Sequence, residues 1–144
     1  MRALLDVNVL IALQDAAHIH HRRATDWMEA HWQQGWASCP LTQNGCLRIL
    51  SQAGYPNAQT PNAVRERLLE ATSHPMHRFF ADDFSLLDEG VLSWRHVTGS
   101  RQLTDAYLLA LAVRNTLRFV SFDRGLSLST VRGARAEHLV SLFA

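Results

Sequence analysis

The chain opens on an apolar stretch that an acid interrupts, Leu4-Leu5-Asp6-Val7-Asn8-Val9-Leu10-Ile11. This pattern predicts a buried first strand over Ala3 to Leu5 and a short helix over Val9 to Leu13. A carboxylate among leucines and valines loses hydration, and an isolated buried charge is costly unless it is paired, protonated or bound to a metal. Asp6 is therefore a candidate functional residue at the end of the first strand.

Length and composition predict a single domain. The chain has 144 residues, of which 47% are hydrophobic, and this is ample for one sizeable core. Its most apolar run, Ala106 to Val113, is much shorter than the roughly 20 residues that a membrane-spanning helix needs. The first strand begins almost at once, which leaves no room for a signal peptide, and we expect Cys39 and Cys46 to remain reduced. We therefore expect one cytoplasmic domain over residues 1–144, with no membrane association.

The charged residues are unusual in kind rather than in number. The net charge is only +1, and all 14 basic residues are arginine, with no lysine. Guanidinium groups suit bidentate phosphate contacts and stacking on bases, but a compositional bias of the source genome would give the same pattern. The absence of lysine excludes phosphate sites that depend on it, such as the P-loop.

Short apolar strands alternate with amphipathic helices along the chain, which indicates an α/β fold with a mostly parallel central sheet and helices on both faces. In such sheets, binding sites form outside the carboxyl ends of the strands. The pattern predicts strands at Ala3 to Leu5, Gly35 to Ser38, Phe84 to Leu87, Arg118 to Ser121 and His138 to Leu142. It predicts helices at Val9 to Leu13, His18 to His31, Leu41 to Gln52, Pro61 to Thr72, Glu89 to His96 and Thr104 to Asn115.

Three acids fall at similar places in this pattern. Asp6 ends the first strand, where Asn8 could cap the next helix, and Asp123 follows the strand Arg118 to Ser121. Asp105 begins the most apolar helix, where Thr104 is a plausible N-cap. Each has an ordinary explanation, because helix dipoles favour acids in a first turn and turns favour aspartate. Together, three neighbouring carboxylates would repel by several kcal/mol per pair at a separation of about 4 Å, so they fit a Mg²⁺ or Mn²⁺ site that activates water at a phosphodiester.

Three segments carry a resemblance to a known family. They are the opening stretch around Asp6, the run Thr104-Asp105-Ala106-Tyr107-Leu108-Leu109-Ala110-Leu111-Ala112 and the segment Ser121-Phe122-Asp123-Arg124-Gly125. In order and spread, they resemble the motifs of PIN-domain ribonucleases, especially the VapC toxins of bacterial toxin-antitoxin pairs. The resemblance implies a three-layer α/β/α PIN domain and a Mg²⁺- or Mn²⁺-dependent endoribonuclease. It also implies a homodimer that a cognate VapB-type antitoxin inhibits by covering the active site.

The resemblance assigns site residues by motif. Asp6, Asp105 and Asp123 become metal ligands or residues that orient the attacking water. PIN domains usually carry a glutamate early in the third helix, and Gln43 stands at that place in Cys39-Pro40-Leu41-Thr42-Gln43-Asn44-Gly45. An amide oxygen can still coordinate a metal or hold a water, but it brings no charge and cannot act as a base. Candidates for substrate contact are Asn8, Arg101 and Arg124, and a solvated surface remains the alternative for the two arginines.

Two other functions fit parts of the sequence. A phosphoryl-transfer fold with a nucleophilic aspartate, of the haloacid dehalogenase or receiver type, also places an early acid on a parallel sheet. Both of those folds use a lysine that this chain lacks, and the dehalogenase pattern needs a second aspartate where Asn8 stands. The second alternative is a PIN-like module that lost charge at Gln43 and only binds RNA or a partner protein.

Overall fold

Five short parallel strands form one sheet in the order β3-β2-β1-β4-β5, and the computed structural model describes residues 1–143. The central strands are the most apolar, and β1 is buried along three of its four residues. Pairing between β1 and β4 runs from Arg2↔Leu117 to Leu5↔Val120. The strands are β1 (Arg2–Leu5), β2 (Trp36–Ser38), β3 (His77–Phe79), β4 (Leu117–Ser121) and β5 (Leu139–Ser141).

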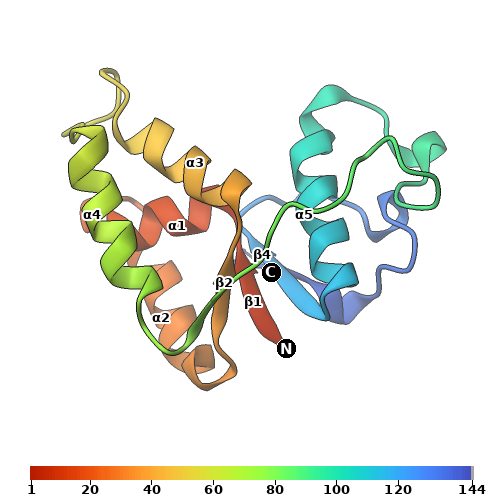
Figure 1. Cartoon of the computed structure of the whole chain (residues 1–144), viewed down its shortest axis with the longest axis horizontal. Helices are drawn as coiled ribbons and strands as arrows, with labels where there is room; N and C mark the ends of the chain where they lie inside the picture. Colours follow the sequence, from red (N-terminus) through yellow and green to blue (C-terminus); the bar gives the residue numbers. More distant parts are fainter. Residues whose placement is uncertain (144) are drawn as a thin grey trace.

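Helices cover both faces of the sheet (Figure 1). Helices α1 to α4 gather on one side, where their buried residues form one core cluster, and α5 packs on the other side within a second cluster. This arrangement confirms the predicted three-layer α/β/α architecture. The helices are α1 (Val7–Gln14), α2 (His21–His31), α3 (Pro40–Leu50), α4 (Pro61–Thr72) and α5 (Leu103–Arg114).

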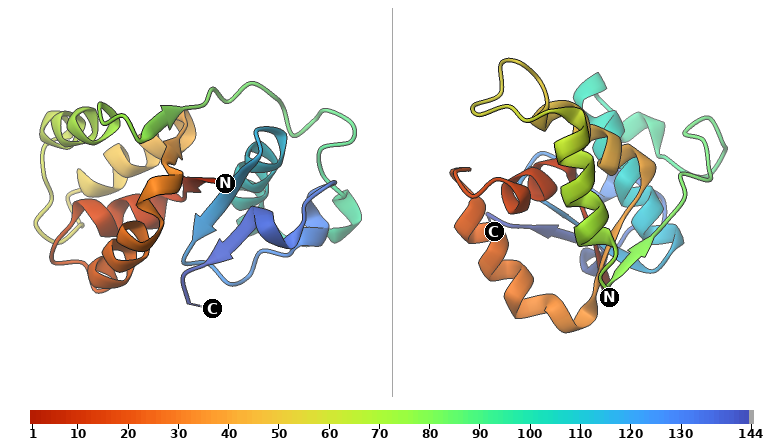
Figure 2. Two further views of the ribbon diagram at one scale, coloured as in Figure 1. Left: turned by 90° about the horizontal axis from the view of Figure 1, so that it is seen from below. Right: turned by 60° about the vertical axis from the view of Figure 1, so that its left-hand side comes forward.

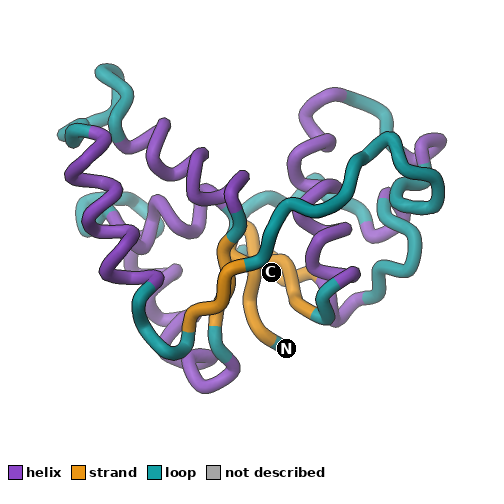
Figure 3. The backbone as a smooth tube through the Cα atoms, viewed as in Figure 1, coloured by secondary structure: helices purple, strands orange, loops and turns teal. Residues whose placement is uncertain are grey.

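A long segment with little regular structure joins the two sides of the molecule. It leaves β3 and runs over residues 80–93 to the α5 side, as Figures 2 and 3 show. Short 3₁₀ turns η2 (Trp94–His96) and η3 (Ser100–Gln102) then lead into α5. The remaining 3₁₀ turns are η1 (Trp32–Gln34), η4 (Leu128–Thr130) and η5 (Ala136–His138).

Two predicted elements are wrong, and one strand was not predicted. Residues 84–87 form no strand, because Phe84 and Leu86 lie on the α5 core cluster as part of the irregular segment. Residues 89–96 contain only η2, since Gly90 adopts φ +84° and interrupts any helix there. Strand β3 escaped prediction because it is a short edge strand whose residues are half-buried or exposed.

The predicted helix caps also need correction. Asp6, and not Asn8, caps α1, because its side chain accepts a hydrogen bond from the Val7 amide. Thr104 lies inside α5, because η3 leads directly into that helix and Gln102 takes the cap position. Within residues 1–143, none of the helices has the length and apolar character needed to cross a membrane.

Candidate active site

The carboxyl ends of β1 and β4 lie side by side where the strand order reverses, because β2 and β3 extend the sheet on one side of β1, and β4 and β5 extend it on the other. The chain leaves β1 into α1 on one face, whereas β4 is reached from α5 on the other face. Ligands of open α/β sheets bind at such a switch point. Register pairs Leu5 with Val120, so Asp6 and Ser121 follow side by side.

Asp6 is held in one orientation at this point, and its side chain is only 6% exposed. Its Oδ1 accepts a hydrogen bond from the Val7 amide at 2.7 Å, and its Oδ2 accepts one from Ser121 Oγ at 2.6 Å. Burial raises the pKa of Asp6 above its ordinary value, and the charge of Asp123 adds to that rise. The two hydrogen bonds act in the opposite direction and stabilise the ionised form.

Asp105 and Asp123 share a hydrogen bond beside Asp6. Burial, the hydrogen bond to Asp123 and the charges of Asp6 and Asp123 raise the pKa of Asp105 to about 8. The pKa of Asp123 moves the other way, first because the Gly125 amide donates to its Oδ1 at 2.7 Å and then because Asp105 donates to it. The pKa values of the two neighbours therefore move in opposite directions, up for Asp105 and down for Asp123.

Ser121 is a site residue that sequence reasoning missed. Its hydroxyl donates to Asp6 Oδ2 and accepts a hydrogen bond from the Asp123 amide at 2.9 Å. One side chain thus fixes the orientation of one acid and the backbone position of another. Its location at the end of β4, two residues before Asp123, was the only sequence signal for this role.

The two arginines and Asn8, the candidates for substrate contact, make different contacts in the structure. Arg101 lines a small cavity of about 280 Å³ together with Asp105 and Asp123, whereas Arg124 lies over the Phe143 ring at 4.7 Å. Asn8 Oδ1 accepts a hydrogen bond from the Phe122 amide at 3.4 Å and so ties α1 to the end of β4. The other residues that line the cavity are Gln102, Gly125 and Leu126.

Gln43 lies in the first turn of α3 but is not hydrogen-bonded to the acids. Its Nε2 donates to Ser38 Oγ, at the end of β2, at 2.9 Å. It does not line the cavity of Asp105 and Asp123. The structure thus brings Asp6, Asp105 and Asp123 together and leaves Gln43 engaged with β2.

The acids suit a hard divalent cation by their chemistry. Within residues 1–143, no group of three or more His, Cys, Asp or Glu side chains lies in an arrangement that could hold a metal ion. The three aspartates nonetheless offer only oxygen ligands, which Mg²⁺ and Mn²⁺ prefer. The raised pKa of Asp105, due first to burial and then to its acidic neighbours, also fits a cluster whose negative charge a divalent cation would offset.

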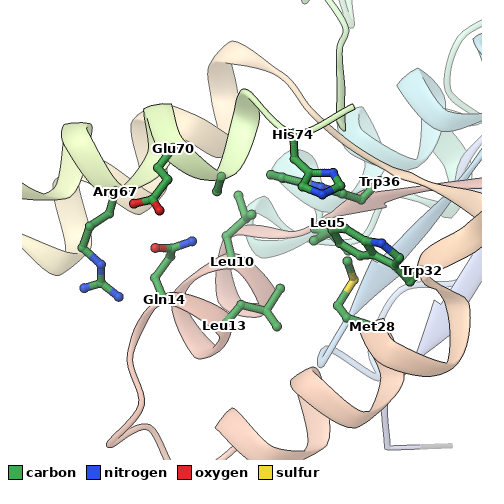
Figure 4. A pocket seen from close by; sticks show the side chains of 11 residues that line it. Leu5, Leu10, Leu13, Gln14, Met28, Trp32, Trp36, Arg67, Glu70 and His74 are labelled. Atoms are coloured by element: carbon green, nitrogen blue, oxygen red, sulfur yellow. The ribbon is translucent and has the colours of Figure 1, made fainter. Parts of the chain in front are cut away.

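A larger and mostly apolar cavity lies elsewhere, on the side that α1, α2 and α4 cover (Figure 4). Its volume is about 470 Å³, and it shares no lining residue with the cavity of Asp105 and Asp123. Leu10, Met28 and Trp32 point into it, with Arg67 and Glu70 at one end. Such a lining suits apolar side chains rather than phosphodiester chemistry.

Comparisons with known proteins agree with this geometry. The family model described as PIN domain matches residues 3–130. Ribonuclease VapC44 of Mycobacterium tuberculosis is 45% identical over 142 residues, which cover 99% of this chain and 100% of that protein. Ribonuclease VapC38 of the same species is 44% identical over 124 residues, covering 85% of this chain and 86% of that protein.

Two solved structures share the fold at low sequence identity. The Mycobacterium tuberculosis toxin VapC20, described as cleaving the sarcin-ricin loop, aligns with a TM-score of 0.58 at 15% identity, over 85% of this chain and 91% of that chain. The structure of FitAB bound to a DNA fragment aligns with a TM-score of 0.63 at 17% identity, over 99% and 96%. The sheet, the acids at its switch point and the family match together establish that the chain belongs to the PIN-domain family, among the VapC ribonucleases.

Proposed function

We propose that this protein is an endoribonuclease toxin that hydrolyses RNA phosphodiester bonds with a Mg²⁺ or Mn²⁺ ion bound by Asp6, Asp105 and Asp123. The meeting of these three acids at the switch point carries the proposal, because burial, the hydrogen bond to Asp123 and the charges of Asp6 and Asp123 together raise the pKa of Asp105 to about 8. A bound cation would offset the neighbouring negative charges and so lower the pKa of Asp105. The ribonuclease names of relatives up to 45% identical support RNA as the substrate.

Each protein group has a distinct task in this proposal. A bound divalent cation supplies a Lewis acid for the phosphodiester and for the attacking water. Asp6, fixed by Val7 and Ser121, presents its remaining lone pairs in one direction. Asp105 and Asp123 bind the ion or orient the water, and Arg101 contacts an RNA phosphate, a role that its position in the lining of the same cavity supports.

Cleavage of an end-labelled structured RNA in Mn²⁺ tests the proposal. Wild-type protein should cleave the RNA, EDTA should stop cleavage, and Asp6→Asn should abolish it. Asp26→Asn is the matched control, because Asp26 is an exposed acid of α2 that pairs only with Arg22 at 3.7 Å. Equal cleavage by wild type and Asp6→Asn would point to a contaminating nuclease and remove the support for this site.

We also propose that the protein forms a homodimer and is inhibited by a cognate VapB-type antitoxin. The apolar cavity beside α1, α2 and α4 offers a surface on which a partner could bury hydrophobic side chains. A small protein encoded next to this gene should copurify with the chain and suppress RNA cleavage. Sedimentation of the purified chain as a monomer at micromolar concentration would argue against the dimer.

A second function is favoured by the amide at position 43. Because Gln43 is neutral and donates to Ser38, the site has one acid fewer than the PIN pattern, which suits a module that binds RNA or a protein without cleaving it. Wild-type protein that retains RNA in a binding assay, yet never cleaves it in Mn²⁺, would select this function over the nuclease.

A further inference from the structure

We propose that Ser38 and His77 are positioning residues that orient the side-chain amide of Gln43 and leave its oxygen free at the carboxyl end of the sheet. This orientation follows from hydrogen bonds within the chain. Its consequence for RNA cleavage rests on the proposed function. Nothing in the resemblance to PIN domains assigns a role to Ser38 or His77.

A continuous chain of hydrogen bonds joins α3 to the edge of the sheet. Gln43 Nε2 donates to Ser38 Oγ at 2.9 Å, and Ser38 Oγ lies 2.8 Å from His77 Nε2. Ser38 is the last residue of β2 and is 1% exposed, so water does not replace these partners. The His77 ring is held against Trp36, with ring centroids 4.4 Å apart.

The inventory of donors fixes the direction of this chain. A serine hydroxyl has one proton to donate, and the amide nitrogen of Gln43 cannot accept it. His77 Nε2, 2.8 Å away, is the other partner of this hydroxyl, so we assign the hydroxyl proton to it; in this assignment Nε2 accepts and carries no proton of its own. Neutral His77 then has its proton on Nδ1.

A second contact supports the same tautomer. A hydrogen bond to the backbone of Thr72, at the end of α4, acts to raise the pKa of His77, as expected where a ring N–H donates to a carbonyl oxygen. Because Nε2 faces Ser38, this N–H is the one on Nδ1. Burial is the largest effect on His77 and lowers its pKa, which favours the neutral ring.

In this assignment, all donors of the chain point from Gln43 towards Thr72. His77 donates to Thr72, Ser38 donates to His77, and Gln43 donates to Ser38. The Gln43 oxygen is left as an acceptor without a protein donor in residues 1–143. If His77 instead donated from Nε2, the Ser38 hydroxyl would donate to the Gln43 oxygen. The NH₂ group of Gln43, rather than its oxygen, would then be free at the carboxyl end of the sheet.

Close packing holds α3 against the beginning of α1. A Cβ atom on Gly45 would lie 2.6 Å from Val7 Cγ2, so α3 contacts the beginning of α1 directly. Val7 is also the residue whose amide binds Asp6. Gln43, two residues before Gly45, therefore lies at the same end of the sheet, where its oxygen can accept a hydrogen bond from a water or present a neutral ligand.

The protonation of the His77 ring nitrogens tests the proposal directly. In long-range ¹H–¹⁵N spectra of the full-length protein at neutral pH, His77 should have a protonated Nδ1 and an unprotonated Nε2, with His77→Gln identifying its signals. Ser38→Ala should shift the Nε2 signal and speed exchange of the Gln43 amide protons. A protonated Nε2 in the wild-type protein would overturn the proposed orientation.

Gln43→Glu should reverse the direction of the hydrogen bonds in this chain. A carboxylate can only accept, so it takes the Ser38 proton, and His77 must then donate from a protonated Nε2. Asn44→Asp is the matched control, because it adds the same charge at the next, exposed position without a bond to Ser38, and it should leave the His77 signals unchanged. An unprotonated Nε2 in Gln43→Glu would refute the hydrogen-bond chain.

These spectra need no RNA, so they separate this proposal from the proposed function. If the wild-type protein fails to cleave RNA while His77 shows the expected tautomer, the nuclease is refuted and the orientation stands. If the wild-type protein cleaves, Ser38→Ala should cleave about tenfold more slowly, as expected for a residue that orients a site group through one hydrogen bond. Cleavage by Ser38→Ala at the wild-type rate would remove the functional role of the chain.

Discussion

At the scale of single residues, Asp105 is the acid whose ionisation is opposed by burial and by the neighbouring negative charges. Its pKa rises to about 8 because burial and two acidic neighbours disfavour a third charge. Asp6 and Asp123 have compensating donors, from Ser121, Val7 and the Gly125 amide. We therefore expect the proposed site to hold one proton when no cation is bound, and to release it when one binds.

This protonation predicts how stability depends on pH in the absence of metal. The folded-state pKa of about 8 lies above the unfolded value of 3.8, so the folded protein binds the Asp105 proton more tightly. That stabilisation is complete below pH 3.8 and is lost as the pH rises through 8. In EDTA, the free energy of unfolding by urea should fall by about 1–2 kcal/mol more in wild type than in Asp105→Asn between pH 5 and pH 8.5, after allowance for solvent screening.

Equal pH dependence of the two proteins would contradict the raised pKa of Asp105. Comparison with Asp105→Asn is needed because other groups titrate over the same range. His18 and His77, for example, both have pKa values lowered by burial.

Ser121→Ala should impair the site without unfolding the protein. The substitution keeps the size of the buried side chain but removes the donor to Asp6 Oδ2 and the acceptor of the Asp123 amide. Loss of one such supporting bond commonly costs 10- to 100-fold, so we expect Mn²⁺ affinity and RNA cleavage to fall by roughly that factor. Ser129→Ala, in the exposed part of η4, is the control, and equal Mn²⁺ affinities of the two variants would refute the supporting role.

Gln43→Glu should tighten Mn²⁺ binding. The substitution restores a negative charge at the position where PIN domains usually carry glutamate, and carboxylates bind hard cations more strongly than amides do. Calorimetric titration compares the two proteins, and equal dissociation constants would show that position 43 does not reach the ion.

Residues of the proposed site could be predicted from sequence only where a residue is anomalous on its own or lies within a recognisable motif. Asp6 interrupts an apolar strand, and Asp105 and Asp123 lie within recognisable motifs, so their proximity was foreseeable. Ser121 and the contact of Ser38 with His77 were not, because each depends on strand register between distant segments. Serine and histidine at strand ends carry no signal until their partners are known.

At the scale of elements, local signals predicted some segments well. Helix α4 spans the predicted Pro61–Thr72, because Thr60 caps it through its side chain and Pro61 suits the first helical position. The apolar residues of segment 80–93 misled the prediction, because they cover the α5 core from an irregular backbone. Hydrophobic spacing alone cannot distinguish such a covering segment from a strand or a helix.

The contact of α3 with α1 gives a prediction at this scale. Gly45→Ala would place a Cβ atom 2.6 Å from Val7 Cγ2 and force the two helices apart. Such overpacking typically costs about 1–3 kcal/mol, although alanine is the better helix former.

Val7→Ala removes the obstructing methyl groups, so the double variant should be less destabilised than the sum of the two single variants. Urea unfolding of all four proteins measures this coupling. Additive effects of the two substitutions would show that the close contact does not set the helix spacing.

At the scale of the whole molecule, three segments far apart in sequence supply the acids of the proposed site. The end of β1 supplies Asp6, the first turn of α5 supplies Asp105, and the segment after β4 supplies Asp123. The strand order brings β1 next to β4, and α5 reaches the same edge from the opposite face. The fold therefore determines the site, since none of these segments could assemble it alone.

Calorimetric titration of MnCl₂ into the metal-free protein, in two buffers of different ionisation enthalpy, tests most directly whether the three aspartates form one cation site. At pH 7, we expect wild-type protein to bind Mn²⁺ with release of about one proton, which comes from Asp105. We expect Asp6→Asn and Asp123→Asn each to weaken binding more than about tenfold, and Asp105→Asn to lose the proton release as well. Wild-type affinity in all three variants, or no Mn²⁺ binding by the wild-type protein, would contradict a shared cation site.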